Sequence, residues 1–415
     1  MRNNRHDLVC DVSRVRYRRI ILPRRVIRRL SFRRGALCLL LFSCLAFGQA
    51  HPEKATDFSH FRPRRELPGE SFAGREACAS CHAEKSRSQS QTAMGHALSI
   101  AAESAVLRSH PRMTFRAGAY SYEIVSDGQE NSYCVTDGKE TIREPILYAF
   151  GNAHVAQTYV YRRNGRLYEG RVSYYTAIDG LDWTIGDVLN PVPSLEEAAG
   201  RDIGGDEARN CFSCHGAAAV VNTKLQLDRL IPGVTCESCH GPGGSHAAVM
   251  LFGPGKSMYI FNPKTLDAES LSQEFCGACH RGVDTVAMMP DLGGINNVRF
   301  QPYRLFNSRG HDPKDARLAC TACHDPHKDL KQGDTAYDAK CATCHAPRGV
   351  EQATGQKNIA TAGKRPVLSS TGKSCPVASE RCVSCHMPKV ELPGAHFKFT
   401  DHRIRIARQG EAYPY

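Results

Sequence analysis

Residues 235–246 have the sequence TCESCHGPGGSH. Their first half contains the pattern Cys-Xaa-Xaa-Cys-His, which decides the fold of this chain. The pattern occurs seven times, at residues 78–82, 211–215, 236–240, 276–280, 320–324, 341–345 and 382–386. With 19 cysteines and 18 histidines in 415 residues, chance predicts roughly 0.04 copies. The repetition therefore reflects the chemistry of the protein.

This pattern is the attachment signature of a c-type haem, so the chain is predicted to carry seven covalently attached haems. Two thiols at positions i and i+3 bind the vinyl groups of one porphyrin, and the adjacent histidine binds the iron as its proximal ligand. The predicted attachment thiols are Cys78, Cys81, Cys211, Cys214, Cys236, Cys239, Cys276, Cys279, Cys320, Cys323, Cys341, Cys344, Cys382 and Cys385. The predicted proximal ligands are His82, His215, His240, His280, His324, His345 and His386. Zinc sites pair their CxxC units with each other, and a disulfide framework needs no histidine, so the repeated histidine favours haem.

The ligand on the opposite face of each iron decides the chemistry of that haem. A second histidine gives a closed, low-potential electron carrier, methionine raises the potential, and an open position gives an enzyme site. The candidate distal histidines are His246, His311, His327, His396 and His402. His327 follows the proximal His324 too closely to reach the same iron, so we expect it to bind a neighbouring haem.

The first haem has two candidate ligands, Met94 and His96, of which one helix can present only one well. His154 is equally well interpreted as a ligand, a substrate-facing group or a polar strand residue. The candidate ligands are numerous enough to give every iron a second axial ligand. Their number does not exclude a haem with an open axial position.

Residues 1–50 are predicted to be a signal peptide. Twelve arginines against Asp7 and Asp11 precede the apolar run 36–47, which is too short to span a membrane comfortably. This leader carries +10 of the net charge of +12, leaving +2 for the remainder. Haem propionates would make that remainder acidic, so nucleic-acid binding is not expected. Because haem is attached outside the cytoplasm, we expect a periplasmic protein.

The spacing of the motifs divides the mature chain into three parts. Residues 51–111 are predicted to form an N-terminal segment with haem 1, residues 112–188 a small inserted antiparallel β module, and residues 189–415 a domain with haems 2–7. Residues 157–175 (QTYVYRRNGRLYEGRVSYY) predict a hairpin on a type I′ turn. The predicted fold class is a mostly α and irregular multihaem cytochrome c fold around that insert.

The haem-binding part contains few aliphatic residues for a core of its own, so porphyrins are expected to supply the buried apolar surface and the haem-free chain to fail to fold. Cys134 and Cys375 lie outside the motifs. A disulfide between them and two unrelated thiols are equally good interpretations.

The chain resembles the multihaem cytochromes c of the cytochrome c-552/4 type, which are related to nitrite reductases and hydroxylamine oxidoreductases. The resemblance is carried by FAGREACASCH, TCESCHGPGGSH, CTACHDPH and CVSCHMPK, and covers residues 72–402 outside the β module. The family usually has Trp-x-x-Ser-x-His after its first motif, where this chain has QSQTAM at residues 89–94. The axial ligation of haem 1 is therefore expected to differ from that of the other haems. Its enzymes use a lysine-ligated haem or a tyrosine cross-link, and no CxxCK occurs here. The resemblance thus implies electron transfer more than catalysis.

Three functions agree with these features. The first is a periplasmic heptahaem carrier between respiratory redox partners, such as cytochromes or a quinol-linked membrane complex. The second is an oxidoreductase that acts on a small nitrogen or sulfur oxyanion at one open haem near His96 or His154. The third is a subunit of a membrane-associated respiratory complex, held through the β module and not through a spanning helix of the mature chain.

Overall fold

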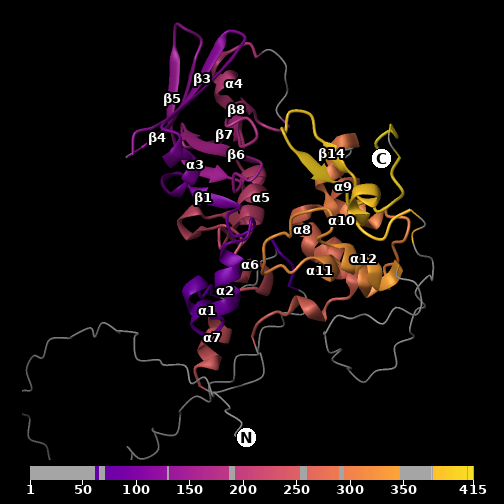
Figure 1. Ribbon diagram of the computed structural model, residues 1–415. Coiled ribbons are helices and arrows are strands. Elements are labelled where there is room, and N and C mark those ends of the chain that lie inside the picture. Colours follow the sequence, from indigo (N-terminus) through magenta and orange to yellow (C-terminus); the bar gives the residue numbers. More distant parts are fainter. Residues whose placement is uncertain are drawn as a thin grey trace, which may run out of the picture. The chain divides into compact units, whose positions relative to one another are not determined.

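The computed structural model describes residues 61–64, 71–128, 130–186, 192–252, 259–288, 294–345, 375, 377–408 and 410–414 (Figure 1). The signal-peptide prediction, residues 1–50, lies outside these ranges. Within them, no helix combines the length and the apolar character that crossing a membrane requires.

The largest element is a nine-stranded antiparallel sheet. Seven strands follow one another in space as in sequence: β2 (Arg112–Ala117), β3 (Tyr120–Ser126), β4 (Asn131–Thr136), β5 (Thr141–Phe150), β6 (Ala156–Arg163), β7 (Arg166–Tyr175) and β8 (Gly180–Trp183). β1 (Leu98–Ile100) pairs with β5, and β9 (Gly200–Asp202) pairs with β7. The sheet thus extends past residues 112–188 on both sides, because the segment after the first motif and the segment before the second motif add a strand each.

The predicted hairpin is confirmed at β6 and β7. Arg163 pairs with Arg166 across a two-residue loop. Both loop residues have positive φ, 49° at Asn164 and 77° at Gly165, as a type I′ turn requires.

One face of the sheet builds an aromatic core. Tyr133 stacks on Tyr161 with ring centroids 5.3 Å apart, and Tyr161 stacks on Tyr168 at 5.6 Å. Trp183 packs edge-on against Tyr122 at 5.7 Å. The helices α3 (Ala105–Ser109) and α4 (Leu195–Ala199) contribute further buried residues to this core. The sheet therefore has a hydrophobic interior of its own side chains.

A second buried cluster fixes the helix of the second motif against the sheet. α5 (Asp206–His215) buries Ala208 and Phe212 among sheet residues that include Val160. Phe212 meets Tyr148 and Phe150 of β5 edge-on, at 5.0 and 5.1 Å. Figure 1 shows α5 beside β6. The helix that carries the second motif therefore packs directly against the sheet.

The other motif elements are short. They are α1 (Arg75–Cys81), α2 (Ala83–Ser90), α6 (Cys236–His240), α7 (Gly244–Met250), η5 (Ser270–Cys276), α8 (Gly277–His280), α9 (Val283–Ala287), α10 (Gln301–Phe306), α11 (Cys320–Cys323), α12 (Asp338–His345) and α13 (Cys382–His386). Short 3₁₀ turns at Ala101–Glu103, Leu227–Arg229, Pro263–Thr265, Gly294–Arg299 and Ala316–Leu318 connect them.

Three two-stranded antiparallel sheets lie among the segments that carry the motifs. They pair β10 (Gly216–Ala217) with β13 (Ile231–Pro232), β11 (Val220–Val221) with β12 (Lys224–Leu225), and β14 (Lys389–Glu391) with β15 (Lys398–Thr400). Among the described residues of this part, one buried apolar cluster has five members, Phe61, Phe261, Leu271, Phe275 and Ala319. Such a cluster is small for a segment of this length, as the sequence predicted.

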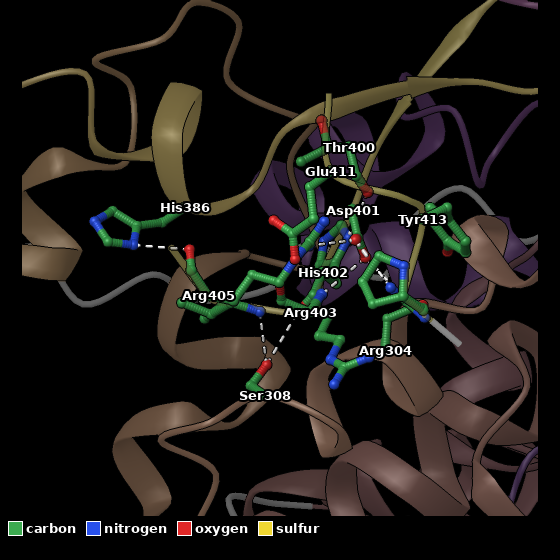
Figure 2. Close-up of polar contacts among 12 residues, drawn as sticks. Arg304, Ser308, His386, Thr400, Asp401, His402, Arg403, Arg405, Glu411 and Tyr413 are labelled. Atoms are coloured by element: carbon green, nitrogen blue, oxygen red, sulfur yellow. Dashed lines mark hydrogen bonds and ion pairs between the residues drawn. The ribbon is translucent and has the colours of Figure 1, made fainter. Parts of the chain in front are cut away.

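A buried ion pair fixes the C-terminal segment (Figure 2). Arg304 of α10 donates two hydrogen bonds to the Asp401 carboxylate, at 2.8 and 2.9 Å, and both side chains are 0% exposed. Arg405 donates a third, at 2.7 Å. Burial alone would raise the pKa of Asp401, but the hydrogen bonds from Arg304 and from the backbone N–H of Arg403 lower it. The pair holds the chain next to His402.

We predict that in the haem-free chain the sheet still folds, whereas the part that carries the haem motifs does not. The sheet core consists of protein side chains, whereas the motif part has little apolar surface without porphyrin. Hydrogen exchange on chain made without haem attachment should show protected amides in residues 112–128 and 130–183 and none in the described residues between 236 and 408. Protection throughout, or in neither part, would contradict this division.

We also predict that Arg304→Ala lowers the free energy of unfolding by about 3–5 kcal/mol, because it leaves the Asp401 charge buried and without its main partner. Arg317→Ala is the matched control. It breaks the exposed pair with Asp315 and should cost about 0–1 kcal/mol. Denaturant unfolding of the haem-loaded protein measures both, and equal losses would argue against the role of burial.

Candidate haem-binding sites

Each attachment motif lies on a helical turn. The seven turns are α1, the end of α5, α6, the junction of η5 and α8, α11, α12 and α13. A helical turn places residues i and i+3 on one face, so the two cysteines of each motif other than the one on α12 point to the same side. This is the arrangement that attachment to a single porphyrin requires.

The described cysteines form no disulfide. The motif cysteines among them are half-buried or exposed, whereas Cys134, in β4, is buried. Cys375 is exposed and also a free thiol, so of the two interpretations of Cys134 and Cys375 the structure has separate thiols.

Hydrogen bonds from distant backbone orient three proximal histidines. The Nδ1 atom of His215 lies 3.1 Å from the carbonyl oxygen of Ala97. His240 Nδ1 lies 2.9 Å from that of Phe261, and His386 Nδ1 lies 2.9 Å from that of Arg405. A carbonyl oxygen can only accept, so each Nδ1 carries the proton and each Nε2 keeps a free lone pair. Nε2 is then the nitrogen available to a metal.

Burial favours the neutral form of five candidate ligand imidazoles. Desolvation lowers the pKa of His215, His240, His280 and His324 below the ordinary histidine value. It lowers the pKa of His402 to about 4. A neutral ring is the form that binds a metal ion.

Two proximal imidazoles face a second imidazole from another part of the chain. The ring centroids of His240 and His327 are 6.1 Å apart, with planes 15° apart. Those of His324 and His402 are 6.3 Å apart, with planes 41° apart. Two metal–nitrogen bonds of about 2 Å, plus about 1.1 Å from each nitrogen to its ring centre, separate two axial imidazoles by about 6 Å. The spacing fits one iron between each pair.

His327 faces the third motif and not its own. Its ring lies against that of His240, 87 residues away in sequence, while His324 faces His402. A turn produces this direction: Lys328 N–H donates to the Asp325 carbonyl at 3.0 Å, and Pro326 stands in the second position. The turn therefore orients the His327 ring away from the fifth motif.

The Nε2 atoms of two other candidate ligands contact carboxylates. His311 Nε2 lies 3.3 Å from Glu269 Oε2, and His396 Nε2 lies 2.7 Å from Asp182 Oδ2. His396 also packs edge-on against Tyr175 at 5.0 Å. The structure therefore places His396 against the sheet, in contact with β8.

The candidates for haem 1 lie in the loop between α2 and β1. His96 is exposed and Met94 is half-buried. His246 lies on α7, directly after the third motif. The ring of His154 packs edge-on against Phe397 at 5.8 Å. His82 and His345 are exposed.

Contacts between motifs bring their attachment points together. The buried carboxylate of Glu237, inside the third motif, accepts N–H groups of Ala73 at 2.7 Å and Gly74 at 3.0 Å, just before the first motif. Cys320 N–H donates to Ser272 Oγ at 3.4 Å, which joins motifs 4 and 5. Cys382 N–H donates to Asp338 Oδ1 at 2.9 Å, which joins motifs 6 and 7.

Sequence reasoning missed the groups that orient the ligands. The three carbonyls carry no sequence signal, because any residue offers one. Tyr337 Oη lies 3.4 Å from His324 Nδ1, and the tyrosine also gave no signal. The Asp-Pro-His order after the fifth motif is a turn signal that sequence reasoning could have used.

Comparison with known proteins gives matches of limited extent. Residues 193–241, which contain motifs 2 and 3, match the family model described as cytochrome c554 and c-prime. The chain is 27% identical over 203 residues to the multiheme cytochrome MtrA of Shewanella baltica (strain OS185), covering 44% of this chain. The match spans about half of that relative, 53% of its length.

A solved structure, that of the outer cell wall cytochrome OcwA, aligns with 80% of this chain and 79% of its own, at 16% identity and a TM-score of 0.42. In its repeated attachment motifs and in these sequence matches, the chain is similar to multihaem c-type cytochromes.

Proposed function

We propose that the protein is a periplasmic heptahaem cytochrome that passes electrons between redox partner proteins through haems with mostly two histidine ligands. The observation that carries the proposal is the pairing of His240 with His327 and of His324 with His402. With a haem bound between the two rings of a pair, the second imidazole would occupy the position where a substrate would otherwise bind. Such sites exchange electrons and do not bind substrate.

The residues that would hold each haem are the two cysteines and the histidine of its motif. Bound haem supplies a one-electron couple whose potential depends on the axial ligands and their hydrogen bonds. The chain's own residues do the remaining work: backbone carbonyls orient proximal rings, and turns deliver distal rings. Contacts from Glu237, Ser272 and Asp338 hold neighbouring motifs together. Close neighbours are what electron hopping needs.

The periplasmic location rests on two features. Haem is attached to CxxCH motifs outside the cytoplasm, and the leader has the charge and the apolar run of an export signal. Partners of this carrier would then be other extracytoplasmic cytochromes or a quinol-linked membrane complex. An oxyanion would be a substrate only if one haem had an open iron.

We predict that His327→Ala opens one haem. Removing the distal imidazole leaves one axial position free, so low-temperature EPR of the oxidised, haem-loaded variant should show a high-spin signal that added nitrite converts. His402→Ala should open a different haem in the same way. His110→Ala is the matched control, because His110 bonds to Asp179 and faces no motif histidine among the described contacts.

The unmodified protein sets the baseline for this experiment. Low-spin signals that nitrite does not alter mean that every iron is closed and that the protein is a carrier. A high-spin signal that nitrite converts before any substitution would overturn the carrier proposal in favour of an oxidoreductase. Variants of His327 and His402 that stay low-spin would overturn the ligand assignment alone.

A further inference from the structure

The Asp325 carboxylate contacts the ring of His327, the candidate distal ligand of the third motif. Its Oδ1 atom accepts the backbone N–H of His327 at 3.0 Å and lies 3.3 Å from Nδ1 of the same residue. The Asp325 carbonyl meanwhile accepts the N–H of Lys328, which closes the turn. Because Pro326 fixes one φ of this turn, carboxylate and imidazole are held together by the backbone.

This partner differs in charge from those of the other candidate ligands. The Nδ1 atoms of His215, His240, His386 and His402 meet neutral backbone carbonyls, and that of His324 meets the phenol of Tyr337. His311 and His396 contact carboxylates through Nε2. Among these histidines, His327 is therefore the one whose Nδ1 meets a carboxylate, and its ring centroid lies 6.1 Å from that of the proximal His240.

A carboxylate on Nδ1 changes what Nε2 does to a metal. It makes the ring a stronger electron donor, which stabilises the oxidised iron more than the reduced iron. A second carboxylate belongs to the third motif itself. Glu237, between Cys236 and Cys239, is buried and accepts N–H groups of Ala73, Gly74 and Gly243. Both negative charges lower the reduction potential of a haem held there.

The site also has a defined place among the motifs. Glu237 connects the third motif to the segment that precedes the first motif. His327 comes from the segment that follows the fifth motif. The third motif therefore lies between the attachment points of haem 1 and haem 5.

We propose that Asp325, acting through His327, sets the haem of the third motif to a lower potential than the haem between His324 and His402, so that it is an uphill step for electrons moving between haems 1 and 5. The proposal rests on the function proposed above. The step adds one electron to the iron from a neighbouring reduced haem. No bond is formed or broken, and no proton is transferred.

Asp325→Asn tests this in the haem-loaded protein. The amide oxygen still accepts the His327 N–H, so the turn is kept while the charge is lost. In a spectroelectrochemical titration, one seventh of the absorbance change should move to higher potential, by about a tenfold change in its reduction equilibrium constant, or about 59 mV for a one-electron couple. Haem content and the low-spin EPR signals should stay unchanged.

Asp137→Asn is the control, since its carboxylate accepts the N–H of Lys139 at 2.8 Å in a sheet loop, in the same local geometry.

The outcomes separate this inference from the function on which it rests. If Asp325→Asn moves no component, or moves no more than Asp137→Asn does, the role of Asp325 is wrong, even where His327→Ala opens a haem. If His327→Ala leaves every haem low-spin, the ligand assignment itself fails. A shift spread equally over all seven components would also overturn the proposal, because the contact touches one site only.

Discussion

The orientation of the proximal histidines is the constraint on which the haem-binding part depends. An imidazole can present Nε2 in one fixed direction only when Nδ1 has a fixed acceptor. These acceptors come from distant segments: Ala97 for His215, Phe261 for His240 and Arg405 for His386. A motif is therefore complete only when the surrounding loops and the C-terminal segment have folded around it.

The two parts of the protein meet this constraint in different ways. The sheet has its own aromatic core and presents a rigid face to α5, so the second motif rests on conventional hydrophobic packing. Several other motifs are joined by polar contacts between segments. Arg304 with Asp401 fixes the segment that delivers His402, and Glu237 joins motifs 1 and 3. Because buried charges are costly without partners, removing one member of such a contact should have large effects.

The histidines show where sequence reasoning works and where it stops. That His327 could not reach the iron of His324 follows from three residues of chain, and its ring does lie against His240 in the structure. His396 had an equally good sequence context, yet it contacts Asp182 of β8. A strand 214 residues earlier in the chain is not visible in local spacing. The edges of the sheet show the same limit, since β1 and β9 are three-residue strands that exist only through pairing.

The sequence by itself determined the attachment chemistry and the β hairpin, because CxxCH spacing and an Asn-Gly turn are local patterns with a direct physical meaning. It also limited the candidate distal ligands to a few histidines and Met94. Only the tertiary structure decided which imidazole faces which, and which group receives each Nδ1 proton. Those choices depend on backbone carbonyls and on contacts between segments up to 214 residues apart, which no residue type announces.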